Sequence, residues 1–278
     1  MFNKHSLKKI KLIVTDLDGA ILNSKNEISS STKSLVKKLN AKGIRLTFAS
    51  GRPFSAMGNF ISELNIELPV ISLDGCCICY PESGQVIYES FVPAKYVSNA
   101  LSLADEYLLN VVLCQNKAIY YTDSNSVVKD LMYKFGARYK KISSYDEIKE
   151  KTLEIVFASD YKDNLQSVKN KLSFPNTFGL NISFYKSQRN GGIYYLEVRK
   201  KSVNKGKALI KLLRNISVDE RNTAVIGDWY NDISLFKTRA FKVTLANGIP
   251  ELKENADLVI TKTNDQEGVA EFLEMLLK

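Results

Sequence analysis

Short apolar runs and amphipathic segments alternate over the first quarter of the chain, and this alternation limits the fold more than any other feature. The apolar runs cover residues 11–15, 45–49 and 69–73 and have the length of strands, while residues 29–42 and 54–64 show helical spacing. A strand, a helix and a further strand in this order form a βαβ unit, whose two strands lie parallel. We therefore predict a parallel sheet covered by helices.

The alternation is interrupted after residue 74 and resumes after Lys200. A hairpin pattern comes first. Beyond Pro93 the segments, including a helix expected over 126–135, follow the order of an open antiparallel or mixed sheet with helices on one face. A parallel-sheet domain interrupted by an α+β domain accounts for this pattern. We expect the first domain to comprise residues 1–86 and 193–278, and the inserted domain residues 87–192.

The composition is that of a globular protein with a sizeable core. Hydrophobic residues make up 45% and charged residues 25% of the 278 residues, and no apolar run is long enough to cross a bilayer. The basic N-terminus lacks the apolar stretch and cleavage site of a signal peptide. The only histidine is His5 and three of the four cysteines cluster at 76–79, so we expect buried thiols rather than disulfides or a zinc site. These features predict a soluble, cytoplasmic protein with no membrane partner.

The net charge of +9 raises the question of a nucleic-acid partner. Lysines are spread through the chain, as in the pairs at 37–38, 140–141 and 200–201, and no nucleic-acid-binding module accompanies them. The plain interpretation is a solvated basic surface, and a functional one is that this surface attracts anionic metabolites. We expect no nucleic-acid partner.

Acidic residues directly follow two of the strand-like runs. Asp16 and Asp18 come after the first run, Asp228 follows the run at 223–226, and Asp232 lies shortly beyond it. Side chains at the carboxyl ends of parallel strands meet at one edge of the sheet. Burying carboxylates together is costly unless a cation or a shared proton compensates, and Mg²⁺ is bound through carboxylate oxygens and substrate phosphate. The pattern therefore indicates a Mg²⁺ site, the alternative being a loop of solvated carboxylates.

Groups suited to phosphate accompany these carboxylates. Ser50, Gly51 and Arg52 follow the second apolar run and open a helix, so backbone N–H groups and the serine hydroxyl can bind an anion. Lys205 stands at the start of a predicted helix, where its ammonium group can neutralise phosphate charge. Each feature alone also fits an ordinary helix cap or a surface lysine. Their occurrence together with the acidic residues favours phosphoryl chemistry.

These motifs together resemble the haloacid dehalogenase (HAD) superfamily of phosphatases, and within it the Cof-type sugar-phosphatase subfamily. The resemblance covers essentially the whole chain, including the position of the insert and the tail around Asn247. It implies an α/β fold with a Rossmann-like parallel-sheet core. It also implies that the insert is an α+β cap of type 2 (C2B), which selects the substrate.

The resemblance implies a role for each matching residue. Asp16 would be the nucleophile that forms an aspartyl-phosphate, and Asp18 would be the general acid and base. The residues that would contact phosphate or substrate are Ser50, Gly51, Arg52, Asp74, Gly75, Lys205 and Asn231. The Mg²⁺ site would involve Asp16, Asp18, Asp228 and Asp232, with Asp18 contributing its backbone carbonyl and Asp232 acting behind the ligands.

Two positions depart from the family pattern. Ala20 stands where the family usually has a threonine, and Asp74 stands where an asparagine is common. Neither departure removes a required group. The sequence therefore predicts a Mg²⁺-dependent phosphatase that hydrolyses small phosphorylated metabolites, such as sugar phosphates or similar phosphomonoesters.

Two alternative functions stay open at this point. One is a non-catalytic phosphometabolite-binding protein, which the departures at Ala20 and Asp74 would suit. The other is a phosphomutase. In each case the expected partner is a small phosphorylated metabolite, and we expect a monomer or a weak homodimer.

Overall fold

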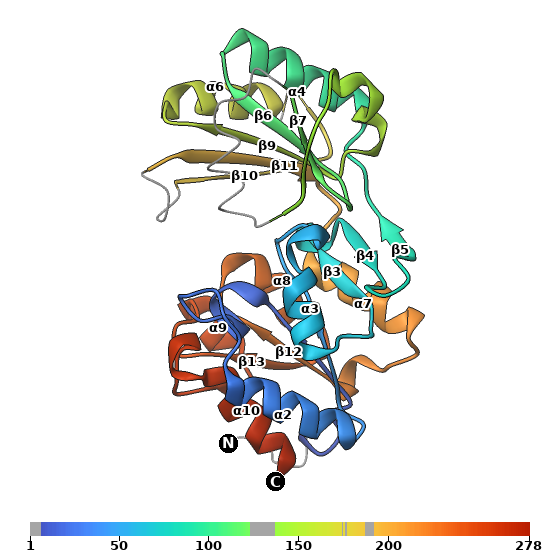
Figure 1. Cartoon of the computed structure of the whole chain (residues 1–278). Helices are drawn as coiled ribbons and strands as arrows, with labels where there is room; N and C mark the ends of the chain where they lie inside the picture. Colours follow the sequence, from blue (N-terminus) through green and yellow to red (C-terminus); the bar gives the residue numbers. More distant parts are fainter. Residues whose placement is uncertain (1–6, 123–136, 174, 176, 187–191) are drawn as a thin grey trace. The chain divides into compact units, whose positions relative to one another are not determined.

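The computed structural model describes residues 7–122, 137–173, 175, 177–186 and 192–278 (Figure 1). The helix expected over 126–135 lies outside the described residues. Contacts divide the chain into two compact units, and each is described by itself. The core unit comprises the residues up to Gly51, Gly58–Tyr88 and Asn204–Lys278, and the insert unit comprises Arg52–Met57 and Glu89–Val203.

A parallel sheet of five strands forms the middle of the core unit. Its order is β14 (Leu258–Val259), β13 (Phe241–Thr244), β12 (Thr223–Gly227), β1 (Leu12–Thr15) and β2 (Arg45–Phe48). Every residue of β1 and β12 is buried, as expected for strands with helices on both faces. β1 lies between the strand that follows it in sequence and β12 from the far end of the chain. Ligands of open α/β sheets bind at such a change of strand order, beyond the carboxyl ends of the strands.

A small second sheet continues from the edge of β2. A parallel bridge between Ala49 and Ile71 joins the end of β2 to β3 (Val70–Ser72). β3, β4 (Cys77–Cys79) and β5 (Val86–Glu89) follow in order, with β3 and β4 antiparallel. The hairpin predicted after residue 74 is therefore present, and its cysteines are buried thiols outside any disulfide bond, as expected.

The helices of the core unit pack on the parallel sheet. They are α2 (Ser30–Ala41), α3 (Gly58–Leu64), α7 (Lys205–Asn215), α8 (Ile233–Phe236), α9 (Pro250–Asn255) and α10 (Gly268–Leu277). α2 begins where the Ser29 hydroxyl accepts a hydrogen bond from the Thr32 N–H group. α2 and α10 lie side by side, and α7 contacts α8 (Figure 1). Leu209 and Leu212 of α7 share a buried cluster with Leu12 of β1, which fixes α7 on the sheet.

The insert unit is a six-stranded sheet with helices on one face (Figure 1). Its order is β10 (Leu180–Lys186), β11 (Tyr194–Lys200), β9 (Glu154–Ser159), β6 (Asn110–Cys114), β7 (Ile119–Tyr121) and β8 (Tyr139–Lys141). Neighbouring strands are antiparallel except β7 and β8, which are parallel. Helices α4 (Ala94–Glu106) and α6 (Lys162–Leu172) bury apolar residues against alternate positions of β9 and β11. The predicted fold, a parallel-sheet core with an inserted α+β unit, is confirmed.

Short turns complete both units. They are Leu17–Ile21, Phe54–Ala56, Leu73–Gly75, Tyr145–Glu147, Lys149–Lys151, Glu220–Asn222, Tyr230–Asp232 and Asn264–Gln266. None of the described helices combines the length and the apolar composition that a membrane crossing needs.

Three details differ from the pattern read in the sequence. The helix expected over 54–64 divides into a 3-10 turn and α3, because Met57 N–H bonds to Phe54 in the tighter spacing of that turn. β8 gave no signal in the sequence because it is a three-residue edge strand with two lysines. The expected bounds placed residues from 193 onward, and so β11, in the core domain. In the structure β11 pairs with β9 and β10, and the insert unit extends to Val203.

Candidate active site

The predicted site residues of the core unit gather beyond the carboxyl ends of its parallel strands. Asp16 follows β1 and Asp228 follows β12, and these strands are neighbours in the sheet. Ser50 comes after the bridge that links β2 to β3, and its carbonyl accepts a hydrogen bond from the Asp74 N–H group at 3.0 Å. The edge of the sheet therefore brings together residues from four separate segments of the chain.

Lys205 is the buried positive charge of this region. It opens α7, is fully buried, and places its ammonium nitrogen 2.8 Å from Asp16 Oδ2 and 2.8 Å from Asp232 Oδ1. Asp74 Oδ1 lies further away, at 3.8 Å. Burial acts to lower the pKa of Lys205, but the carboxylates of Asp16 and Asp232 outweigh it and raise that pKa above its usual value. The lysine thus keeps its charge while hidden from water.

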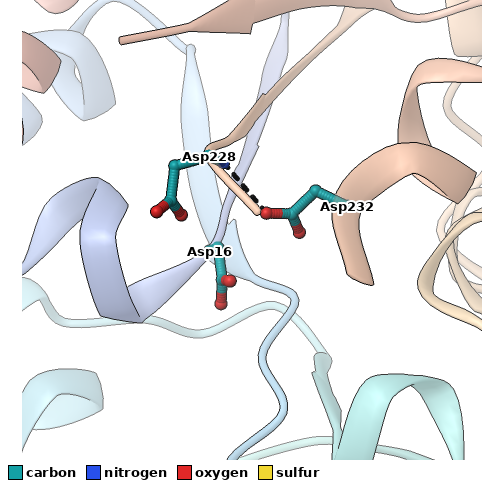
Figure 2. A group of neighbouring side chains, drawn as sticks. All are labelled: Asp16, Asp228 and Asp232. Carbon is teal, nitrogen blue, oxygen red and sulfur yellow. Dashed lines mark hydrogen bonds between the residues drawn. The ribbon is translucent and has the colours of Figure 1, made fainter. Parts of the chain in front are cut away.

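Asp232 ties the loop after β12 to Lys205. One carboxylate oxygen accepts from Lys205 and the other accepts from the Trp229 N–H group at 3.2 Å. The second oxygen also accepts from the Asp228 N–H group at 3.0 Å (Figure 2). A Cβ on Gly227 would come within 2.5 Å of Asp232, so this close packing requires glycine. Both carboxylate oxygens of Asp232 therefore accept from protein donors.

Asp228 has a carboxylate oxygen that receives no hydrogen bond from the described residues. Its side chain is buried, and no donor among the described residues reaches its Oδ1 atom. Burial, and after it the nearby Asp232 carboxylate, raise the pKa of Asp228 to about 7. A Cβ on Gly19, whose φ is +71°, would lie 2.0 Å from Asp228 Oδ2, so the backbone of the first loop rests directly against this carboxylate. A buried oxygen without a donor indicates a missing cationic or protonated partner.

Three of the acidic residues offer oxygens that could hold a metal ion. Asp16, Asp228 and Asp232 each contribute a carboxylate oxygen, and these lie within 4.8 Å of one another (Figure 2). The Lys205 ammonium group pairs with two of these carboxylates, those of Asp16 and Asp232. An all-oxygen donor set with excess negative charge fits a hard divalent cation. The Asp18 side chain is exposed and does not belong to this group.

Asp16 is held at both carboxylate oxygens. Oδ1 accepts from the Leu17 N–H group at 2.7 Å, and Oδ2 pairs with Lys205. Burial raises the pKa of Asp16 well above its usual value, Lys205 partly offsets this effect, and Asp232 adds to it. A group that supplies further positive charge would therefore favour the ionised, nucleophilic form of Asp16.

Two of the phosphate-binding candidates, Asn231 and Gly51, lie next to the Asp74 carboxylate. Asn231 Nδ2 donates to Asp74 Oδ1 at 3.0 Å, and a Cβ on Gly51 would lie 3.2 Å from the same oxygen. Gly75, with φ +103°, packs against the Asn204 carbonyl at the start of α7. Ser50 is buried. Arg52 is also buried, but its contacts group it with the insert unit.

Asn247 is a site residue to which the sequence reading gave no role. Its Nδ2 atom donates to the Gly19 carbonyl at 2.7 Å, and its Oδ1 atom accepts from the Asn264 N–H group at 3.0 Å. Asn247 thus fastens the first acidic loop to the C-terminal segment. The signal available in the sequence was an asparagine followed by glycine shortly after the strand at 241–245.

Comparison with known proteins extends over nearly the whole chain. A model of the haloacid dehalogenase-like hydrolases matches residues 13–273. Phosphatase YwpJ of Bacillus subtilis is 25% identical over 290 residues, which cover 96% of this chain and 100% of that protein. The 5-amino-6-(5-phospho-D-ribitylamino)uracil phosphatase YwtE of the same organism is 26% identical, with coverages of 96% and 98%. A crystal structure of a haloacid dehalogenase-like hydrolase from Bacteroides thetaiotaomicron aligns with a TM-score of 0.84 and 29% identity, covering 95% of this chain and 98% of that one.

Proposed function

The chain belongs to the haloacid dehalogenase-like hydrolase family, as its sequence predicted, and from this premise we propose that it is a Mg²⁺-dependent phosphatase of small phosphorylated metabolites. The observation that carries the proposal is the placement of Asp16. This carboxylate pairs with the buried ammonium of Lys205 and offers an oxygen within 4.8 Å of carboxylate oxygens of Asp228 and Asp232. The two related phosphatases of Bacillus subtilis support the reaction class, and their different names leave the substrate open.

Asp16 acts as the nucleophile in this proposal. One of its oxygens attacks the phosphorus atom, the bond from phosphorus to the ester oxygen breaks, and an aspartyl-phosphate forms. Asp18, exposed two residues further on, donates the proton that the departing alkoxide needs. As a carboxylate it then removes a proton from a water molecule, which attacks the phosphorus atom. The bond to Asp16 breaks, inorganic phosphate leaves, and both side chains return to their starting states.

The remaining charges of the site bind and orient the phosphoryl group. Lys205 compensates phosphate charge while it holds Asp16 and Asp232 in place. Ser50, Gly51 and Asn231 are the further candidates for phosphate contacts. Asp16, Asp228 and the Asp18 backbone carbonyl would hold Mg²⁺, with Asp232 behind them. The bound ion would supply positive charge that offsets repulsion between the Asp16 carboxylate and a phosphate dianion.

A second candidate function is a phosphometabolite-binding protein without turnover. The observation that favours it is Asp74, whose carboxylate lies 3.8 Å from the Lys205 ammonium and adds negative charge beside the phosphate candidates. Asp74 also accepts a hydrogen bond from Asn231, which partly stabilises the negative charge of its carboxylate. Ala20, the other departure, is buried and offers no polar group to the site.

Turnover of p-nitrophenyl phosphate separates the two functions. With millimolar Mg²⁺ we expect release of p-nitrophenol and inorganic phosphate, and with excess EDTA we expect none. The opposite result is a protein that binds inorganic phosphate but hydrolyses neither this ester nor any other in a panel of phosphate esters. That result would reject the phosphatase function and support the binding function.

A further inference from the structure

Two aromatic side chains lie exposed beside the buried charges of the candidate active site. Trp229 is 55% exposed and Tyr230 is 60% exposed, and Trp229 is the only tryptophan of the chain. Among the described residues of the core unit, no other large aromatic side chain is as exposed. Leaving so much apolar ring surface in water forgoes the stabilisation that its burial would bring. Two adjacent exposed rings next to a reaction site suggest a ligand contact.

The backbone places both rings at the edge of the sheet where the site lies. Trp229 directly follows Asp228, so their Cα atoms are about 3.8 Å apart. The Trp229 N–H group donates to Asp232 Oδ2, and the other oxygen of that carboxylate holds Lys205. The next residue, Tyr230, opens the turn Tyr230–Asp232. The carboxylate that accepts from the buried lysine therefore also holds the backbone from which the Trp229 ring extends.

The rings form a defined pair. Their centroids are 5.2 Å apart and their planes meet at 79°, which is an edge-to-face arrangement. Such a pair restrains the orientation of both rings while more than half of each side chain stays accessible. An aromatic side chain has few rotatable bonds, so it offers a flat contact surface at a low cost in conformational entropy.

The charges of the core unit determine which end of a substrate reaches the rings. A phosphoryl group at Asp16 would be bound among buried charges, so the rest of the ester must extend from them toward solvent. The accessible groups that directly follow Asp228 are rings, and a planar π-system stacks on such surfaces irrespective of its detailed hydrogen-bonding pattern.

We propose that Trp229, supported by Tyr230, is a stacking surface for a planar heteroaromatic ring in the alcohol part of the substrate. The preferred phosphomonoesters then carry a nucleobase or a related heterocycle attached to the phosphorylated carbon chain. This inference rests on the proposed phosphatase function and assigns Trp229 to substrate selection, not to the chemical step.

A matched pair of esters tests the assignment. Uridine 5′-monophosphate and ribose 5-phosphate carry the phosphate on the same type of primary alcohol and differ in the base. We expect the full-length enzyme with Mg²⁺ to favour the nucleotide in kcat/KM. Trp229→Ala should reduce this preference by about 5-fold to 150-fold, the range found for loss of a base–aromatic stack. Adenosine 5′-monophosphate should respond in the same direction.

Two variants separate loss of stacking from general damage. Trp229→Phe retains a flat ring and should keep most of the preference. Tyr161→Ala removes an exposed aromatic side chain of the insert unit and should leave the preference unchanged. An enzyme that treats the nucleotides and ribose 5-phosphate alike, or a preference unaffected by Trp229→Ala, would overturn the inference and leave the phosphatase function standing.

Fluorescence of the single tryptophan gives a readout that needs no turnover. Uridine 5′-monophosphate should quench the emission of Trp229 in the parent protein, and ribose 5-phosphate should quench it much less. If the parent protein hydrolyses neither the nucleotides nor ribose 5-phosphate, the proposed phosphatase function is wrong for these esters. The titration then decides the inference alone, and equal or absent quenching by the two compounds refutes the stacking surface.

Discussion

Each unit of the molecule buries a cluster of charges, and the two clusters are built on different kinds of backbone. The core cluster consists of Asp16, Lys205, Asp228 and Asp232, and the insert cluster consists of Glu154, Glu197 and Arg199. All members of the insert cluster lie within the regular strands β9 and β11, and one guanidinium pairs with both carboxylates at 2.6 and 3.0 Å. Members of the core cluster lie beyond strand ends or at the first residue of a helix, and the Lys205 ammonium group pairs with Asp16 and Asp232 at 2.8 Å each.

The core cluster carries the larger excess of negative charge, because it holds three carboxylates and one ammonium group, whereas the insert cluster holds two carboxylates and one guanidinium group. Glu197 and Arg199 are two residues apart on one strand, so they share a face of the sheet without any special backbone. The core cluster depends on glycines that allow close approach, at Gly19 and Gly227, and oxygens of its three carboxylates lie within 4.8 Å of one another. We infer that the core cluster serves a reaction and that the insert cluster serves stability.

The largest expected effect is on turnover by Asp16→Asn. The substitution preserves size but removes the nucleophilic charge, so phosphatase activity should fall on the order of 10⁴-fold or more while the protein stays folded. The matched change in the insert cluster, Glu197→Gln, should leave turnover of p-nitrophenyl phosphate largely intact. Retention of more than a few per cent of parent activity by folded Asp16→Asn would contradict the covalent mechanism.

Arg199→Met should produce the largest loss of stability. It leaves the carboxylates of Glu154 and Glu197 buried without their guanidinium partner, and breaking a buried ion pair in this way typically costs about 3–5 kcal/mol. Urea unfolding measured by circular dichroism gives the value. The control is Lys149→Met, which breaks the solvent-exposed pair with Asp146 and should change stability far less. Equal effects of the two variants would refute the structural role of the insert cluster.

Mg²⁺ should stabilise the protein through the core cluster. Binding to the folded state raises the free energy of unfolding by about 2.7 kcal/mol at a hundredfold excess over the dissociation constant. The melting temperature in millimolar Mg²⁺ should therefore exceed that in excess EDTA. Asp228→Asn should abolish most of this increase, whereas Glu197→Gln should keep it. A melting temperature that does not respond to Mg²⁺ would be evidence against the metal site.

Measured per pH unit, the smallest expected effect is the pH dependence of the metal-free protein. The pKa of Asp228 rises from 3.8 to about 7 on folding, so between these values the folded state binds a proton that the unfolded state has released. The stability from this group is therefore fully present below about pH 4 and is lost as pH rises through about 7, by up to about 1.4 kcal/mol per pH unit. Urea unfolding in EDTA should show this slope, reduced in Asp228→Asn. Identical slopes for parent and variant would contradict the raised pKa.

Much of the site could be predicted because its residues follow apolar runs. Asp16 and Asp228 each come directly after a strand of the parallel sheet, as the alternation predicted, and Lys205 opens a helix. The family match then followed from the order of these motifs along the chain. Local periodicity suffices for such predictions because strand and helix periods depend on neighbouring residues.

The partners of each polar side chain could not be predicted in this way. Asp232 bonds to two backbone N–H groups and to Lys205, and Asn247 fastens the Gly19 loop to the C-terminal segment. Taken alone, Lys205 could equally have been a surface residue, yet it is fully buried. Apart from the two local backbone bonds of Asp232, these contacts join segments that are distant in the chain and meet only through the strand order.

The sequence by itself determined the elements, the interruption of the parallel sheet and the chemical groups at the strand ends. Only the tertiary structure decided that β1 and β12 are neighbours, that Asp228 keeps an oxygen without a donor among the described residues, and that the ring of Trp229 stays exposed. The physical reason is that burial and hydrogen bonding depend on which distant segments pack together, whereas hydrophobic periodicity records only the face that each segment hides.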